Sequence, residues 1–334
     1  MVLDQRNAGA SVTPENTYTV DRWRGMVGGA TGKYSVQQNA GAVTPPAGFT
    51  SYLGVTSLSA YSVTAPDYYV VKQQLEGYNV SDLAYGTASA ATVSVSFWVR
   101  SSLTGNFGIV LVWGGSTANQ RAYPILYTIT SANTWEYKTI VIPGDTTMAA
   151  GGFETTNSTG LQLRIGLGGG ADNAGPSGAW ATSNYQTVTG ATSVVGTNGA
   201  TFYVTGVQLE AGSVATPFEY VDYSRQLQMC QRYYYKSAAE SNGEMFSVFM
   251  SNFALLGTTC FPVTMRAIPT VTYGSQTAYS GNTFANVASG GFITVTLTQN
   301  QVNRNRICNI YDNTKTGVTL GTAYSTYLTA SAEL

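Results

Sequence analysis

The sequence predicts an all-β protein: a jelly-roll β-sandwich followed by a short helix and a smaller C-terminal β-domain. Short runs of β-branched and aromatic residues, bounded by Gly, Pro, Asn and Ser, dominate the chain. The run Thr92–Val99 alternates strictly between an apolar and a polar face, except that Trp98 falls on the polar face. This is the pattern of a half-buried antiparallel strand. Eight or nine such runs in roughly 200 residues are typical of a two-sheet jelly roll.

Nine segments in the first part of the chain carry this strand pattern. Helix signals there are weak, and only Val80–Tyr85 is expected to form a helical turn. The expected strands, in chain order, are Lys33–Asn39, Ser51–Ser59, Tyr68–Glu76, Thr92–Ser101, Phe107–Trp113, Tyr123–Ser131, Trp135–Ile142, Leu161–Leu167 and Thr201–Leu209.

The chain then carries its best helix signal, from Asp222 to Tyr234. Ser224 is placed to cap the helix, and Leu227, Cys230 and Tyr234 lie at helical spacing. We expect this helix to pack beside the sandwich and to lead the chain out of it.

Pro217 and the polar run Lys236–Gly243 bracket this helix, so a domain boundary is expected there. The predicted regions are an N-terminal arm (1–15), the jelly-roll domain (16–221), a helical linker (222–243) and a C-terminal β-domain (244–334). A domain of about 90 residues buries only a modest core, so its apolar end is expected at a symmetric interface. The strands expected in it are Met245–Leu256, Thr259–Met265, Thr270–Tyr273, Gly291–Thr298 and Arg306–Tyr311.

The composition excludes several kinds of chemistry. Histidine is absent from all 334 residues, so no imidazole can act as a general base, activate a nucleophile or hold a metal. Charged residues make up only 10% of the chain, against about a quarter in an average soluble protein. Ser, Thr, Asn, Gln, 37 Gly and 23 Tyr take their place. We therefore predict no cofactor and a neutral surface rich in hydroxyl and amide groups.

The charge pattern also limits the partners. The net charge is −1, and the basic residues form no cluster, whereas nucleic-acid binding depends on clustered Lys and Arg. We predict no nucleic-acid partner. The sequence holds no apolar run of about eighteen residues, so no membrane insertion is expected. The N-terminus lacks the basic-then-apolar order of a signal peptide.

The three cysteines, Cys230, Cys260 and Cys308, are widely spaced and form no CxxC pair. We predict no metal site, because no zinc ligand set is present. Buried, reduced thiols are the first expectation, since free cysteine is commonly a core residue. A disulfide between Cys260 and Cys308 is the alternative.

Several segments together resemble one family of proteins. The segment at 207–220 reads VQLEAGSVATPFEY and the one at 224–235 reads SRQLQMCQRYYY. With Asp4–Gly9, Tyr18–Trp23 and Ser94–Arg100, they resemble the carbohydrate-binding-like β-domain of tailed-bacteriophage fibre and virion surface proteins. The resemblance covers roughly the first two thirds of the chain. Farther on, Phe261–Thr272 resembles a recurrent C-terminal fibre segment in which a strand ends at a proline and restarts.

The resemblance implies a non-enzymatic structural protein: a tail fibre or capsid decoration subunit, made in the host cytoplasm and located on the virion surface. It implies a homotrimer that contacts other virion proteins and contributes to attachment to host-surface glycans. Two alternatives stay open. One is a stand-alone glycan-binding module, and the other is a polysaccharide depolymerase that uses two carboxylates.

Aromatic residues in loops are the candidate glycan contacts, because sugar rings stack on their faces. The candidate set is Trp113, Tyr123, Trp180 and Tyr185, which lie in or beside segments rich in Gly, Ser and Asn. Trp180 has the most exposed context, and its alternative role is burial against a neighbouring chain. Three other tryptophans lie in strand-like segments and are expected in the core: Trp23, Trp98 and Trp135. The triplet Tyr233–Tyr235 is expected to pack between domains or chains.

Other motifs carry less weight, and no catalytic residue is predicted. The segment Gly28–Lys33 imitates a phosphate loop but lacks its first glycine and its final Ser or Thr, so a hairpin turn is expected. The loop Gly168–Gly175 has one acid, too few for a tight calcium cage, although related sugar binders often hold calcium. Five acids are considered as a catalytic pair for glycoside cleavage: Asp67, Glu76, Asp82, Glu136 and Asp145. They are mainly expected to cap turns and to carry surface charge.

Overall fold

The structure is a computed structural model, and its contacts divide the chain into two compact units. Unit 1 is Met1–Tyr220 together with Leu334, and unit 2 is Val221–Glu333. The residues that the structure describes are 1–114, 120–237, 245–251, 254–273, 283–286, 292–294, 298–311, 323–326 and 328–334.

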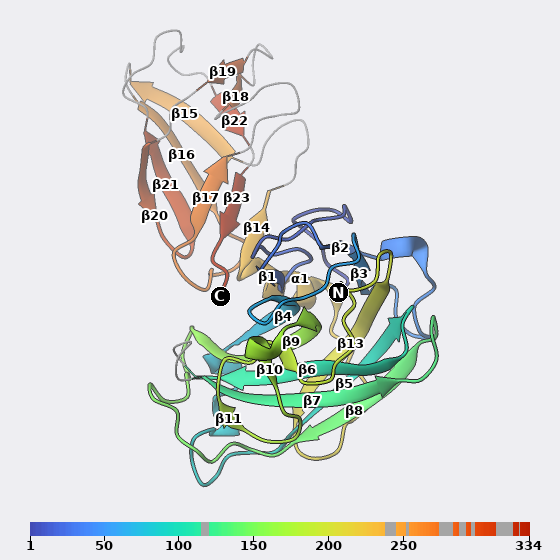
Figure 1. Cartoon of the computed structure of the whole chain (residues 1–334). Helices are drawn as coiled ribbons and strands as arrows, with labels where there is room; N and C mark the ends of the chain where they lie inside the picture. Colours follow the sequence, from blue (N-terminus) through green and yellow to red (C-terminus); the bar gives the residue numbers. More distant parts are fainter. Residues whose placement is uncertain are drawn as a thin grey trace. The chain divides into compact units, whose positions relative to one another are not determined.

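Unit 1 is a sandwich of two antiparallel sheets, with a two-stranded parallel pair beside them (Figure 1). The six-stranded sheet has the order β1 (Trp23–Gly28), β4 (Tyr68–Glu76), β9 (Thr159–Gly169), β6 (Gly105–Trp113), β7 (Arg121–Ile129) and β11 (Ala181–Thr182). The five-stranded sheet has the order β2 (Tyr34–Gln38), β3 (Leu53–Ser57), β13 (Thr201–Ala211), β5 (Val93–Ser101) and β8 (Glu136–Ile142). The parallel pair is β10 (Ala174–Gly175) with β12 (Thr187–Val188).

The all-β prediction is confirmed, and all nine expected strands of the first domain form within a few residues of their expected bounds. The sequence pattern missed β1, although its residues are alternately buried and half-buried. The reason is Gly25, which occupies an inward position and breaks the apolar alternation. A Cβ atom there would come within 2.4 Å of Pro14, so the close approach of the arm requires glycine.

The core lies between the two sheets and is built from the inward residues of each strand. In β5 these are the apolar residues of the predicted alternation, and all four are buried: Val93, Val95, Phe97 and Val99. The ring of Phe97 meets that of Tyr127 on β7 edge-to-face, with ring centroids 5.2 Å apart. Burial of each such side chain contributes about 1.5–3 kcal/mol to the free energy of unfolding.

The segment at 207–220 forms a clasp on the outer face of the five-stranded sheet. Gln208 and Glu210 are outward residues of β13, and both bind the chain that folds back after it. The Gln208 Oε1 atom accepts a hydrogen bond from the backbone N–H of Glu219 at 2.8 Å. The Glu210 carboxylate accepts bonds from the backbone N–H and the hydroxyl of Thr216. Hydrogen bonding from the Gln208 side chain, followed by the bonds from Thr216, lowers the pKa of Glu210. This recognisable segment therefore has a structural role here.

The N-terminal segment Asp4–Gly9 is also held by specific hydrogen bonds. The Asp4 carboxylate accepts from the backbone N–H groups of Asn7 and Gly9, which closes a tight turn. The Gln5 side chain donates to the buried carboxylate of Asp21 at 2.7 Å. Burial raises the pKa of Asp21, against the lowering effect of the Gln5 bond. The two N-terminal segments of the resemblance therefore bind each other.

Unit 2 begins with the helix α1 (Tyr223–Gln231). Its cap is Asp222 and not Ser224 as predicted, because the Asp222 carboxylate accepts from the backbone N–H of Ser224 at 2.9 Å. The helix ends at Gln231, before the predicted Tyr234, because strand β14 (Tyr234–Lys236) begins there. Tyr235 of β14 contacts Phe261 edge-to-face within unit 2. The helical turn expected at Val80–Tyr85 is confirmed as a 3-10 helix at Ser81–Leu83, and a second one precedes it at Gly77–Asn79.

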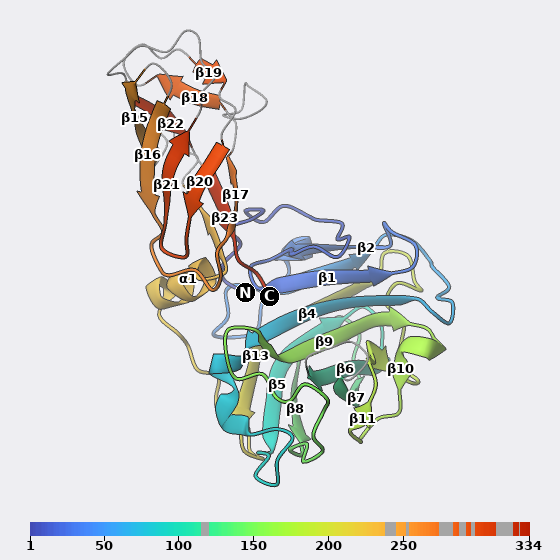
Figure 2. The same ribbon diagram turned by 90° about the vertical axis from the view of Figure 1, so that its left-hand side faces the viewer.

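The strands of unit 2 form a three-stranded and a seven-stranded sheet (Figure 2). The smaller sheet has the order β14, β23 (Leu328–Ser331) and β17 (Thr270–Tyr273). The larger sheet has the order β19 (Phe292–Thr294), β18 (Thr283–Asn286), β22 (Ala323–Thr326), β15 (Met245–Ser251), β16 (Ala254–Cys260), β21 (Arg306–Tyr311) and β20 (Thr298–Val302).

Some expectations for unit 2 are corrected. The expected strand Thr259–Met265 is wrong beyond Cys260, because β16 ends before Pro262 and the chain resumes a strand only after Pro269. Cys230 is half-buried and Cys260 exposed, and neither is in a disulfide. For Cys260, both the expected burial of the thiol and the alternative disulfide with Cys308 are therefore wrong. The Cys308 side chain, most of Lys236–Gly243 and parts of Met245–Leu256 and Gly291–Thr298 lie outside the described residues.

Candidate functional site

Three of the four predicted glycan contacts come together at one end of the sandwich. The ring of Trp180 lies 5.2 Å from that of Tyr123 and 5.7 Å from that of Tyr85, measured between centroids. Tyr85 also contacts Trp113 at 6.1 Å. These four rings form one aromatic cluster, in which edge-to-face contacts predominate.

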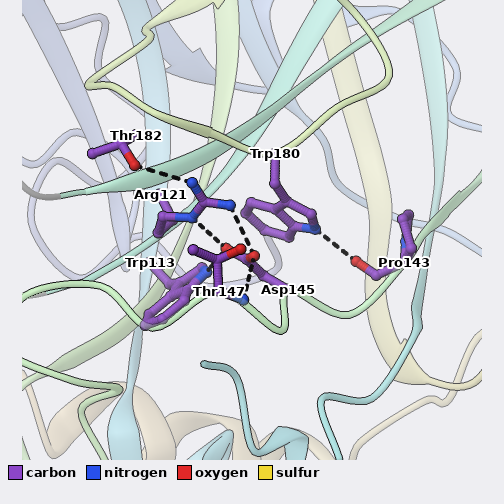
Figure 3. Close-up of polar contacts among 7 residues, drawn as sticks. All are labelled: Trp113, Arg121, Pro143, Asp145, Thr147, Trp180 and Thr182. Atoms are coloured by element: carbon purple, nitrogen blue, oxygen red, sulfur yellow. Dashed lines mark hydrogen bonds and ion pairs between the residues drawn. The ribbon is translucent and has the colours of Figure 1, made fainter. Parts of the chain in front are cut away.

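A buried ion pair lies beside this cluster (Figure 3). The carboxylate of Asp145 accepts two hydrogen bonds from the guanidinium of Arg121, at 2.7 and 2.9 Å. It also accepts from the indole N–H of Trp113 at 2.9 Å and from the backbone N–H of Thr147 at 3.1 Å. Arg121 donates once more, to the hydroxyl of Thr182 at 3.0 Å. The network joins β6 and β7 to the loop that follows β8 and to β11, so its evident role is structural.

Trp113 and Tyr123 are both buried, whereas a glycan contact requires an exposed ring. Trp113 is 1% exposed and Tyr123 is 8% exposed, because β6 and β7 carry these side chains on their inner faces. Neither ring can offer a face to a sugar. Trp180 is half-buried and packs on the core. Its indole N–H donates to the carbonyl of Pro143 at 2.8 Å, so its glycan contact stays a prediction.

Tyr185, the fourth predicted contact, lies apart from this cluster. Its half-buried ring covers Gly175 so closely that a Cβ atom there would lie 2.3 Å from the ring. Its backbone carbonyl accepts a hydrogen bond from Arg164 at 2.8 Å. Its role toward glycan also stays a prediction.

The loop Gly168–Gly175 uses its polar side chains mostly for structure. The Asn173 amide donates to the carbonyl of Pro66 at 2.7 Å, while Asp172 is exposed. Nowhere in the described part of the chain do three or more Cys, Asp or Glu side chains gather as a metal site would require. A pocket of about 270 Å³ lies between Gly169–Ala171 and Thr187–Ala191, and it is lined by small residues without an aromatic ring.

An aromatic pair that was not among the predicted contacts lies on the outer face of the five-stranded sheet. Trp98 of β5 and Tyr137 of β8 are cross-strand partners, with ring centroids 5.4 Å apart and ring planes inclined by 49°. Tyr137 is 44% exposed and Trp98 is half-buried. The next cross-strand pair on the same face is Ser96 with Thr139. The signal for this pair was present in the sequence, because Trp98 falls on the polar face of its alternation.

Trp23 is buried as expected, but the expectation that Trp98 and Trp135 belong to the core was wrong. Trp135 is half-buried and packs with Tyr52 and Tyr203 in a separate cluster. Its indole N–H donates to the carbonyl of Thr44.

Three of the carboxylates considered for glycoside cleavage, Asp67, Glu136 and Asp145, have structural partners. Asp145 binds Arg121, and Asp67 accepts from the backbone N–H and hydroxyl of Thr64, which lowers its pKa. Burial alone would raise the pKa of Glu136, but hydrogen bonds from Lys138, Ser131 and Thr130 lower it to about 2. A general acid needs the opposite shift. Neither Asp67 nor Glu136 is therefore prepared to donate a proton near neutral pH.

No known protein family and no curated protein matches the chain. The similar solved structures include the enzymatically active domain of bacteriophage CBA120 tailspike protein 4, with 11% identity and a TM-score of 0.33 over 60% of this chain and 20% of that chain. They include a xylan-binding domain from Paenibacillus barcinonensis, with 18% identity and a TM-score of 0.32 over 61% of this chain and 99% of that one. A putative sugar binding protein from Bacteroides thetaiotaomicron has 9% identity and a TM-score of 0.34 over 60% of this chain and 92% of that one. The chain spans one fifth of the tailspike chain's length, and similarity this low bears on neither function nor ligand.

In the part of the chain that the structure describes, no helix is both long and apolar enough to span a membrane.

Proposed function

We propose that the jelly-roll domain binds glycan on the outer face of its five-stranded sheet, and that the protein is a non-enzymatic structural subunit of a tailed-phage virion surface. The observation that carries the glycan assignment is the Trp98–Tyr137 pair. It combines the exposed ring of Tyr137 on the edge strand β8 with the half-buried ring of Trp98 on the neighbouring strand β5.

The chemistry of this face suits a sugar chain. The apolar C–H faces of pyranose rings stack on aromatic rings, and two adjacent rings inclined to each other can contact successive sugars. The exposed Thr139 hydroxyl lies beside the pair and can orient a ring hydroxyl. Elsewhere on this face, segments of the chain cover β13, because Thr205 is bound to the carbonyl of Ser51 and Gln208 to the returning chain. The free part of the face is therefore where Trp98 and Tyr137 lie.

Replacing Trp98 with alanine is expected to weaken glycan binding by about 1–3 kcal/mol, or roughly 5- to 150-fold, the scale of a lost aromatic contact. Tyr137→Ala should act in the same direction. The measurement is titration calorimetry with a polysaccharide first identified on a glycan array. Trp180→Ala tests the competing predicted contact: under this proposal it lowers the melting temperature, because the half-buried ring packs on the core, and it leaves the affinity unchanged. Incubation of the polysaccharide with the protein should release no reducing sugar, because the protein is proposed to be non-enzymatic. Loss of binding in Trp180→Ala alone, or release of reducing sugar, would contradict the proposal.

The virion assignment rests on the resemblance of the segments Asp4–Gly9 and Val207–Tyr220 to phage surface proteins. In this chain both segments are held by specific hydrogen bonds. We expect a homotrimer in solution, with a mass three times the chain mass of 35.3 kDa by light scattering. A monomer at micromolar concentration would instead favour a stand-alone glycan-binding module.

A further inference from the structure

Three cations form a row on the outer face of the six-stranded sheet. Lys72 of β4 is the register partner of Arg24 on β1 and of Arg164 on β9. Because directly paired residues of adjacent strands project to the same side of a sheet, all three side chains share one face. Figure 2 shows the three strands lying next to one another.

Arg164 is 3% exposed, and neutral groups satisfy all of its donors. Its five N–H groups are matched by five hydrogen bonds, of 2.8 to 3.3 Å. The acceptors are the side chains of Gln162, Asn184 and Gln120 and the carbonyl of Tyr185. These amides fix the guanidinium in place, but they leave its positive charge uncompensated.

Lys72 is less well satisfied than Arg164. It is 8% exposed, and its one acceptor among the described residues is the Gln162 Oε1 atom at 3.3 Å. That oxygen already accepts two bonds from Arg164. Burial and the positive charges of Arg164 and Arg24 lower the pKa of Lys72 to about 7. The ammonium group therefore has donors to spare and only like charges beside it.

Among the described residues, no carboxylate is among the charges that shift the pKa of Lys72. The charges that act on Lys72 are both positive, and the ion pairs of Asp145 and Glu136 are made with Arg121 and Lys138. The gap at 115–119 contains no acidic residue. Buried cations are normally paired with an anion, so the missing partner is expected from outside the chain.

We propose that Lys72 is the contact point of a second binding site, which takes a carboxylate; that this carboxylate belongs to an acidic sugar rests on the glycan-binding function proposed above. A carboxylate accepts strong, short hydrogen bonds from an ammonium group, and it would provide the negative charge that the row lacks. Lys72 keeps a small accessible surface, and Arg24 beside it is half-buried, so the row can be reached from solvent. The site lies on the opposite sheet from Trp98 and is independent of it.

Binding at this site is linked to a proton. Lys72 is largely neutral at pH 8, and a bound carboxylate favours its charged form, so binding takes up a proton. The groups that face Lys72 are Arg24 on β1 and Arg164 with Gln162 on β9. Burial lowers the pKa of Arg164 only to about 10, so the proton taken up at pH 8 belongs to Lys72.

The test is titration calorimetry of the full chain at pH 8 with sodium glucuronate, in two buffers of different ionisation enthalpy. We expect saturable binding with a proton uptake approaching one per chain, and no binding of glucose at the same concentration. Lys72→Met should weaken glucuronate binding at least tenfold. The matched control is Lys138→Met, which removes the same charge from the opposite sheet and should leave binding unchanged. Trp98→Ala should also leave it unchanged, which separates this site from the proposed glycan face.

Several outcomes would overturn the proposal. One is the absence of saturable glucuronate binding to the wild-type chain, and another is binding that survives in Lys72→Met. If Lys72→Met does not fold, binding to the wild-type chain without proton uptake at pH 8 overturns it equally. Inorganic phosphate is titrated in the same way as a third ligand, beside glucuronate and glucose. Phosphate binding without glucuronate binding would mean that the site takes a free oxyanion and not a sugar acid.

Discussion

Replacing Asp145 with asparagine is expected to lower the free energy of unfolding by about 3–5 kcal/mol, the usual cost of removing one partner from a buried ion pair. Asp145 is 2% exposed and Arg121 is 7% exposed. The neutral amide would leave the guanidinium buried without a counter-charge. It would also place an N–H donor where the carboxylate now accepts from Arg121, Trp113 and Thr147. The measurement is the urea unfolding curve followed by tryptophan fluorescence.

The matched control is the ion pair between Lys138 and Glu136 on the edge strand β8. Lys138→Met should cost only about 1 kcal/mol or less, because a pair near the surface is weak. The double variant Arg121→Met with Asp145→Leu should recover much of the loss, since it removes both charges together. If Asp145→Asn cost no more than the control, the network would have no part in the stability of unit 1.

The stability of the protein is expected to rise with pH between about 7 and 9, and Lys72→Met is expected to remove that rise. The pKa of Lys72 is about 7 in the folded chain and 10.5 as its ordinary value. Between these values the unfolded chain binds more protons than the folded chain, so the free energy of unfolding increases with pH. The slope approaches 1.4 kcal/mol per pH unit for one proton, or about 2 kcal/mol from pH 7 to 9.

Below pH 7 Lys72 is charged in both states, so its destabilising effect is at its full value and constant. Lys72→Met should therefore be more stable than the wild type at pH 6, and the two should converge toward pH 9. Urea unfolding in amine buffers without carboxylate or phosphate measures this difference at each pH. Lys138→Met controls for the change in net charge, and its difference from the wild type should not follow this pH profile. A parallel dependence in the wild type and Lys72→Met would show that another group is responsible.

These two predictions concern opposite uses of a buried charge. Arg121 has its counter-charge inside the chain, and the pair fastens strands and loops at one end of the sandwich. Arg164 and Lys72 have amides around them and no counter-charge, and that arrangement costs stability. A stability cost that neutral residues would avoid is what we expect at a binding site.

The sequence by itself determined the class of fold, because alternation of apolar residues forces one face of each strand into a core. In Thr92–Val99 the alternation identified the strand and the inward side chains correctly. It failed at β1, where Gly25 stands at an inward position, and at the start of α1, where both Asp222 and Ser224 are residue types that cap helices. The absence of histidine also determined, without any structure, which catalytic chemistry the chain lacks.

The tertiary structure alone decided which aromatic rings face outward and which charges meet. Trp113 and Trp98 both lie on strands. Trp113 is buried because it points toward the core, and Trp98 is half-buried because it points to the outer face of its sheet. Arg24, Lys72 and Arg164 are far apart in the chain, and only strand register places them in one row. Local patterns report the periodicity of a strand, whereas contacts between distant strands depend on pairing and packing, which no local pattern records.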